Sequence, residues 1–234
     1  MFYDVWYSGA DEALCERAKQ TAIELFELLE AHWYSHSAWQ LPWSAHQLLD
    51  VLSLIRFEPL GVDTTRLLAR VDEAIAIDGA IDMRRLTISE TQFADWQAGQ
   101  LSSSDWFDIL YKAFTYEYAD CCYPGRFNGT RPRVGVREVL SGLRRHVFES
   151  PCVPRPGSDF GESYYLATHS YYWLSGHAPT VDLTTHAPWL KSYLQRALAF
   201  HMDQAKLREE GVRSEATRDG RVYADLDGIA ECVD

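Results

Sequence analysis

The chain has 234 residues, of which 47% are hydrophobic and 13% aromatic, so it can build a sizeable core. Its formal net charge of −12 and isoelectric point of about 5.1 oppose binding to nucleic-acid phosphates and to an anionic membrane surface. We therefore expect no nucleic acid and no membrane among its partners.

Cysteine usage and the N-terminal segment predict the compartment. The five cysteines form no C-x-x-C pair, which is typical of a reducing environment. The first residues carry neither a basic lead nor an apolar signal core, and no apolar run is long enough to span a bilayer. These features predict a cytoplasmic protein.

The first part of the chain has the periodicity of α-helices. One face of a long first helix is marked by residues that recur at steps of three and four: Leu14, Ala18, Leu25, Leu28, His32 and Trp39. Ser44 followed by Gln47 predicts a capping box. We expect it to begin a second helix, "HQLLDVLSLIRF", that is apolar on almost all sides.

The next helices are predicted from their caps. Thr64 or Thr65 begins a third helix, and Ser89 with Gln92 predicts another capping box. The serines of "SSSDW" cap a further helix, which the glycines and prolines of "CYPGRFNGTRP" end. "VGVREVLSGLRRHVF" then resumes a helix with one apolar side.

The last third begins with an irregular segment. Residues 150–161 hold three prolines and two glycines, which predicts a loop. A long amphipathic helix is expected over "HAPWLKSYLQRALAFHMDQAKLREEG". Convincing alternating strands are nearly absent. About eight to ten helices predict an all-α fold, as a helical-hairpin array or an α/α-toroid-like single domain over residues 1–234.

The segment "ESYYLATHSYYWLSGH" concentrates polar aromatic residues in a helix that is otherwise apolar. Tyr165, His169 and Tyr172 share one face, and Trp173 lies on a neighbouring face. On one interpretation these are core groups, with Thr168 bonded back to its own helix and His169 to a carboxylate across the core. On the other they line a cavity, where His169 is an acid, a base or a metal ligand and the tyrosines donate hydrogen bonds to a small organic substrate.

The final residues, "DLDGIAECVD", form an acidic face if they are helical. Asp227, Glu231 and Asp234 then follow one another at steps of four and three. Either water solvates this face, or Asp227 and Glu231 point inward to arginines, to His169 or to a divalent transition metal. A carboxylate beside an imidazole fixes its tautomer, as a general base requires. This arrangement makes Asp227 and Glu231 candidate catalytic residues, and His169 with Glu231 candidate metal ligands.

The segment "YLATHSYYW" and the later D-x-D-x-x-x-E-x-x-D pattern resemble those of uncharacterised all-helical bacterial proteins. In those proteins a Y-L-x-T-H helix likewise precedes an acidic terminal helix. The resemblance covers roughly the last third of the chain. It implies an all-α fold and a pairing of His169 with Asp227 or Glu231, and it implies no particular activity. The residues after the histidine are aliphatic in those proteins and polar or aromatic here, which indicates a different pocket.

Two other groups are candidates for ligand binding. His32 and His36 have the H-x-x-x-H spacing that zinc sites use, although the zincin glutamate is missing. Histidines near a helix end are also commonly ordinary residues. Arg131 and Arg133 precede a predicted helix N-terminus and can grip an anionic ligand, or they can form salt bridges to the many acidic residues.

Three function classes remain open. The first is a small-molecule enzyme with an aromatic, histidine-containing cavity, using acid–base or metal-assisted chemistry, in the setting of bacterial secondary metabolism. The second is a helical protein-interaction module, which predicts a large exposed apolar patch. The third is a small-molecule binding protein. A protein partner or a homo-oligomer is compatible with all three, whereas P-loop, dinucleotide-binding and serine-hydrolase motifs are absent from the sequence.

Overall fold

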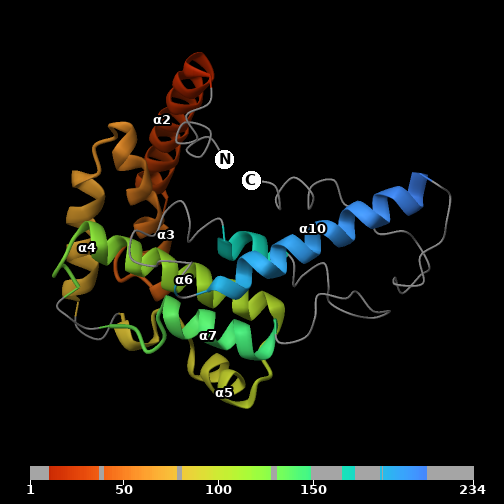
Figure 1. The fold of residues 1–234 in the computed structure, drawn as a ribbon. Helices are drawn as coiled ribbons and strands as arrows, with labels where there is room; N and C mark the ends of the chain where they lie inside the picture. The colour runs from red at the N-terminus through yellow and green to blue at the C-terminus, as the bar shows by residue number, and fades with distance from the viewer. Residues whose placement is uncertain are drawn as a thin grey trace. The chain divides into compact units, whose positions relative to one another are not determined.

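The computed structural model describes residues 11–36, 40–77, 81–127, 131–148, 165–171, 185 and 187–209. All regular structure in these ranges is helical (Figure 1), so the predicted all-α class of about eight helices is confirmed. The choice between an array and a toroid stays a prediction. The loop predicted at 150–161 lies outside the described residues.

The chain divides into two compact units. The first comprises Met1–Leu86 and Ala119–Pro132, and the second comprises Thr87–Tyr118 and Arg133–Asp234. The prediction that one domain spans residues 1–234 stays a prediction.

The first unit contains three α-helices and two short 3₁₀ helices in its described part. They are α2 (Glu12–Ser35), α3 (Ala45–Ser53), η2 (Leu54–Leu60), α4 (Thr65–Ala76) and η3 (Met83–Arg85). The predicted second helix is correct up to Ser53 and then tightens into η2. Pro59 lies inside η2, and proline opposes an α-helical turn because it lacks an N–H and its ring clashes with the preceding turn.

Both predicted capping boxes are confirmed. In the first unit, Ser44 Oγ accepts from the N–H of Gln47 at 3.2 Å, and the Gln47 side chain accepts from the N–H of Ser44 at 2.8 Å. Ser89 and Gln92 make the same exchange at 3.1 and 3.2 Å in the second unit. These reciprocal bonds satisfy N–H groups that a helix start leaves without partners, and they fix where α3 and α5 (Glu90–Ala98) begin.

The core of the first unit is built from α2, α3, η2 and α4. The buried face of α2 carries Ala18, Ala22 and Phe26, and the Phe26 ring packs 5.6 Å from that of Phe57 in η2. The helix predicted at the start of the chain is therefore confirmed. Of the predicted apolar face, however, Ala18 is buried whereas Leu28 is 68% exposed, so the buried face is rotated partly away from the predicted one.

The second unit contains α5, most of α6 (Ser103–Cys122), α7 (Val136–His146), a helical segment at 165–171 and α10 (Pro188–Glu209). One hydrophobic cluster joins α6, α7, α10 and the segment at 165–171. Gly142 permits the close packing of α7, because a Cβ atom there would lie 2.5 Å from the Trp106 ring. This close packing leaves little free space around Trp106.

The predicted start of α6 is also found. Ser102 Oγ accepts from the N–H of Asp105 at 3.1 Å and donates to its carboxylate at 2.5 Å. Among the helices of the described ranges, none is both long enough and apolar enough to cross a bilayer.

Candidate functional site

His169 is half-buried in the second unit, against two aromatic rings. Its imidazole centroid lies 3.9 Å from the Tyr165 ring and 5.5 Å from the Phe107 ring. Its Nδ1 lies 3.0 Å from the carbonyl oxygen of Tyr165, to which the Nδ1–H tautomer donates. The structure thus brings Tyr165 and His169 together, with the described Nδ1 contact made inside their own helix.

The hydroxyl groups beside His169 also bond to their own helix. Thr168 Oγ1 donates to the carbonyl of Tyr165 at 2.9 Å, and Ser170 Oγ donates to the carbonyl of Leu166 at 2.5 Å. Both hydroxyl-bearing residues are buried. The predicted backward bond of Thr168 is therefore confirmed. These two hydroxyls meet their hydrogen-bonding needs without a cavity or a ligand.

Several predicted site residues fall outside the described part of the chain. They are Tyr172, Trp173, Asp227 and Glu231. Their catalytic, ligand-binding and metal-binding roles, and the pairing of His169 with a terminal carboxylate, stay predictions.

The two candidate arginines lie just before α7. Arg133 grips the Glu90 carboxylate with both terminal nitrogens, at 3.1 and 2.9 Å, and its guanidinium lies 4.5 Å from the centroid of the Phe93 ring. Arg131 is exposed. Arg133 therefore forms a salt bridge in this structure, and both terminal nitrogens of its guanidinium group bind a carboxylate of the same chain.

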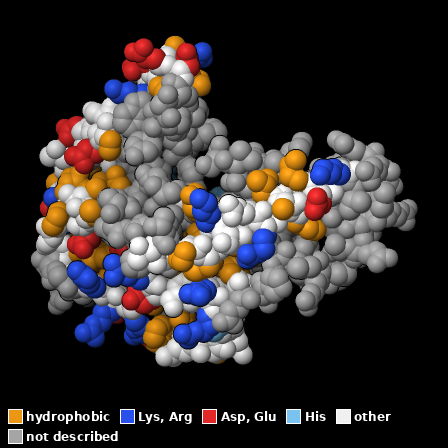
Figure 2. Space-filling model, in the orientation of Figure 1, with side chains coloured by type: hydrophobic (Ala, Val, Ile, Leu, Met, Phe, Trp, Pro, Cys, Tyr) orange, Lys and Arg blue, Asp and Glu red, His pale blue; other side chains and the backbone are white. Residues whose placement is uncertain are grey.

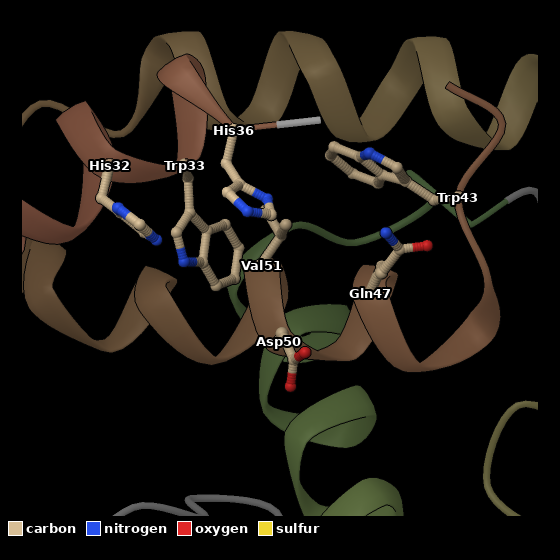
Figure 3. Close-up of a pocket in the computed structure, with 7 residues that line it drawn as sticks. All are labelled: His32, Trp33, His36, Trp43, Gln47, Asp50 and Val51. Atoms are coloured by element: carbon tan, nitrogen blue, oxygen red, sulfur yellow. The ribbon is translucent and has the colours of Figure 1, made fainter. Parts of the chain in front are cut away.

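The clearest hollow with chemical character lies in the first unit, at the end of α2. It has a volume of about 310 Å³ and is lined by His32, Trp33, His36, Trp43, Gln47, Asp50 and Val51. Figure 3 shows the side chains of His32, Trp33 and His36 pointing from α2 toward α3. We call this hollow the α2–α3 cavity.

Local sequence explains how the α2–α3 cavity forms. His32 and Trp33 belong to the last turn of α2, and His36 is its C-cap. The chain then returns to place Trp43 immediately before the capping box that starts α3. Gln47 is held in that box through its side-chain oxygen, and Figure 3 shows its amide nitrogen on the side of Trp43 and His36. Two short stretches of the chain thus face each other.

The two imidazoles of the cavity are close neighbours. The ring centroids of His32 and His36 lie 5.5 Å apart, with their planes tilted by 31°. Both side chains are exposed, so a molecule can reach them from solvent. One imidazole that accepts a proton beside another that donates one is an arrangement suited to acid–base chemistry.

The described cavity lining contains one carboxylate and neither lysine nor arginine. The carboxylate belongs to Asp50, which is half-buried and lies 3.6 Å from the His46 imidazole, four residues earlier on α3. The half-buried indole of Trp33 supplies an apolar face that also attracts cations, and the buried Trp43 forms an apolar wall. This lining suits a neutral or cationic organic group better than an anion.

The H-x-x-x-H pair does not gain a third ligand in the part of the chain that the structure describes. No group of three or more histidine, cysteine, aspartate or glutamate side chains is placed there to hold a metal ion. Within the described residues, a zinc ion at this position would therefore have two candidate ligands, His32 and His36.

A second hollow, of about 530 Å³, lies at the end of α6 and includes Tyr123 and Arg126 in its lining. The Tyr123 hydroxyl donates to Glu58, and burial together with this bond raises the pKa of Tyr123. Arg126 pairs with Asp72 at 2.7 Å and donates to the Leu68 carbonyl at 3.1 Å. These polar groups hold the fold together, so we prefer the α2–α3 cavity as the candidate site.

Sequence reasoning singled out His32 but missed Trp43, Gln47 and Asp50. One signal was present: Gln47 and Asp50 are polar residues three apart on a helix whose leucines and valine are buried, so they share a face. That signal shows the face but not the partner helix opposite it.

Comparison with protein-family models, with curated proteins and with solved structures gave no match to this chain. The case for its function therefore depends on the geometry of the site.

Proposed function

We propose that the protein binds a small organic molecule in the α2–α3 cavity. The proposal depends on one observation: two indoles, two imidazoles and a carboxylate line a single hollow of about 310 Å³. That volume is at the lower end of the range of small-molecule sites, which combine apolar walls with a few polar groups.

The lining favours a ligand with a flat or cationic group. The face of the half-buried Trp33 can stack on a ring or attract an ammonium group. The buried Trp43 closes one wall of the hollow, and Asp50 adds a negative charge. The net charge of −12 also raises the local concentration of cations and opposes anions. We expect choline and indole to bind, and benzoate to bind at least tenfold more weakly.

Ligand-observed NMR titrations with choline, indole and benzoate test the proposal. Probes of this size should bind with dissociation constants on the order of 1 mM. Trp33→Leu should weaken choline and indole at least tenfold, because it removes one indole face. Trp189→Leu, which changes a half-buried tryptophan of the second unit, should leave both affinities unchanged. The proposal is wrong if no probe binds, or if both variants behave alike.

A second candidate function is an enzyme that uses the same cavity. The 5.5 Å separation of the His32 and His36 rings supports it, because two neighbouring imidazoles can act on one bound molecule as acid and base. General acid–base catalysis typically contributes 10²–10⁴-fold to a rate. Hydrolysis of p-nitrophenyl acetate is a suitable probe reaction for paired imidazoles. We expect His32→Ala and His36→Ala each to reduce its rate at least tenfold. Equal rates in both variants and in the unchanged protein would leave binding alone as the function.

An enzyme centred on His169 with Asp227 or Glu231 remains a separate proposal. The close contact of Tyr165 with His169 supports it in part, whereas the bond from His169 to its own helix supports the structural alternative. A setting in bacterial secondary metabolism stays a prediction for either site.

A further inference from the structure

An exposed row of leucines runs along α2. Leu14 is 50% exposed, Leu25 41%, Leu28 68% and Leu29 42%. They are four of the seven large hydrophobic side chains that are exposed in the described part of the chain. We call Leu14, Leu25 and Leu28, with Thr21 between them, the leucine stripe.

The leucine stripe adjoins the face that α2 buries in its own unit, and Ala18 lies where the two meet. Positions 14, 21, 25 and 28 follow one another at steps of seven, four and three, which keeps them on one side of a helix. Ala18, Ala22 and Phe26 form the neighbouring side and are at most 5% exposed. The helix therefore has two apolar sides, of which its own unit covers one.

Charged residues border the stripe in a self-complementary order. Arg17 and Glu24 are both exposed and lie seven residues apart, on the edge of the stripe away from the buried face. Figure 2 shows hydrophobic side chains exposed among basic and acidic ones over α2, at the top of the view. An edge with a positive charge toward one end and a negative charge toward the other complements a reversed copy of itself.

We propose that two copies of this chain associate through antiparallel α2 helices, with their leucine stripes in contact. A two-fold axis beside Thr21 places Leu14 opposite the partner's Leu28 and Arg17 beside the partner's Glu24. Interfaces of this two-fold kind are self-complementary by construction. A parallel pairing would leave the two Arg17–Glu24 edges on opposite sides of the interface.

The size of the contact sets its strength. The antiparallel overlap covers less than three heptads of the 24-residue helix, and short helix pairs are weakly stable. We expect a reversible dimer with a dissociation constant on the order of 10 μM. In this register His32 and His36 lie beyond the overlap, so dimer formation and ligand binding in the α2–α3 cavity are independent.

Sedimentation velocity over protein concentrations on the order of 1 to 200 μM at low salt tests the proposal. The average mass should rise from 26.8 kDa toward twice that value. Leu28→Gln should weaken association at least tenfold. Arg17→Glu and Glu24→Arg should each weaken it about tenfold, and the double variant should restore it, because the charge pair is then reversed but intact.

Glu27→Arg is the matched control, since Glu27 is exposed on the side of α2 away from the stripe. It should leave association unchanged, and circular dichroism should show unchanged helicity in every variant. A protein that stays monomeric at all concentrations overturns the proposal, as does a double variant that fails to restore the dimer. Either result leaves the ligand titrations unaffected.

Discussion

The two histidine-bearing regions of the molecule use similar residues in different ways. At 165–171 the imidazole of His169 lies against two rings and its Nδ1 contacts its own helix. At the end of α2 the imidazoles of His32 and His36 line a hollow together with two indoles. Aromatic density around a histidine therefore indicates packing in one region and an accessible cavity in the other.

The difference arises from where the neighbouring chain lies. The segment at 165–171 packs into the continuous hydrophobic cluster of the second unit through Leu166 and Ala167. The end of α2 faces α3, and Gln47 and Asp50 of α3 help to line the hollow. A cavity forms where two helices meet through large and polar side chains that do not fill the space.

The largest effect should come from filling space in the second unit. In Gly142→Val the new side chain would enter the region of the Trp106 ring, because a Cβ atom at this position would already lie 2.5 Å from that ring. Overpacking of this kind lowers the free energy of unfolding by about 1–3 kcal/mol. Urea denaturation should show it, whereas Ser141→Val, an exposed neighbour in α7, should change it much less.

A smaller addition beside the α2–α3 cavity should be tolerated. Val51→Ile adds one methylene beside a hollow of about 310 Å³, so the unfolding free energy should stay within about 0.5 kcal/mol of its original value. A loss as large as that of Gly142→Val would contradict the contrast between a filled region and an open one.

The next largest loss of stability should come from the start of α6, where Asp105 bonds to Ser102. Hydrogen bonds from Ser102 and Gln92 lower the pKa of Asp105 below its ordinary value of 3.8. A lowered pKa in the folded state stabilises the fold above the unfolded-state pKa, and this contribution is lost as the pH falls through the folded-state pKa. Asp105→Asn should therefore destabilise the protein by about 1 kcal/mol at pH 7, and the difference should shrink below pH 4. Thermal unfolding at both pH values provides the comparison.

Replacing the histidines separates the two regions directly. His169→Ala should lower stability by about 1 kcal/mol, because the imidazole loses its contacts with Phe107 and Tyr165. His36→Ala, at an exposed position, should change stability by less than about 0.5 kcal/mol and should weaken ligand binding. If His169→Ala left stability unchanged and removed an activity, the packing account of His169 would be wrong.

The smallest change in stability should appear in alkaline solution, on replacement of Tyr123. Because the pKa of Tyr123 is raised above 10.0, its protonated phenol stabilises the fold below the unfolded-state pKa. This contribution is lost as the pH rises through the folded-state pKa. In Tyr123→Phe the decline of stability above pH 10 should be shallower than in the unchanged protein. Equal slopes in a pH series of melting temperatures would argue against a Tyr123 pKa raised by burial and by the bond to Glu58.

Much of the fold follows from local sequence. The caps at Ser44 and Ser89 and the start of α6 at Ser102 depend on side chains within three residues of the helix start. Such short-range chemistry can be recognised without knowledge of tertiary contacts. The buried face of α2 was predicted only in part. Ala18 of the expected face is buried, but the larger leucines of that face are exposed, and Ala22 and Phe26 are buried instead.

The candidate site was harder to predict because it depends on which helices meet. His32 was a candidate from its spacing, but Trp43 and Asp50 join it only because α2 and α3 meet in the folded chain. The types of residue around His169 suggested a site there. They do not show that its Nδ1 contacts the carbonyl oxygen of Tyr165, four residues earlier in the same helix.

The most direct test of the α2–α3 cavity is a ¹H–¹³C NMR titration that follows each histidine ring as indole or choline is added. The account predicts that the signals of His32 and His36 shift with one saturable curve while the signal of His169 stays in place. A shift of His169 with His32 and His36 unchanged would contradict it.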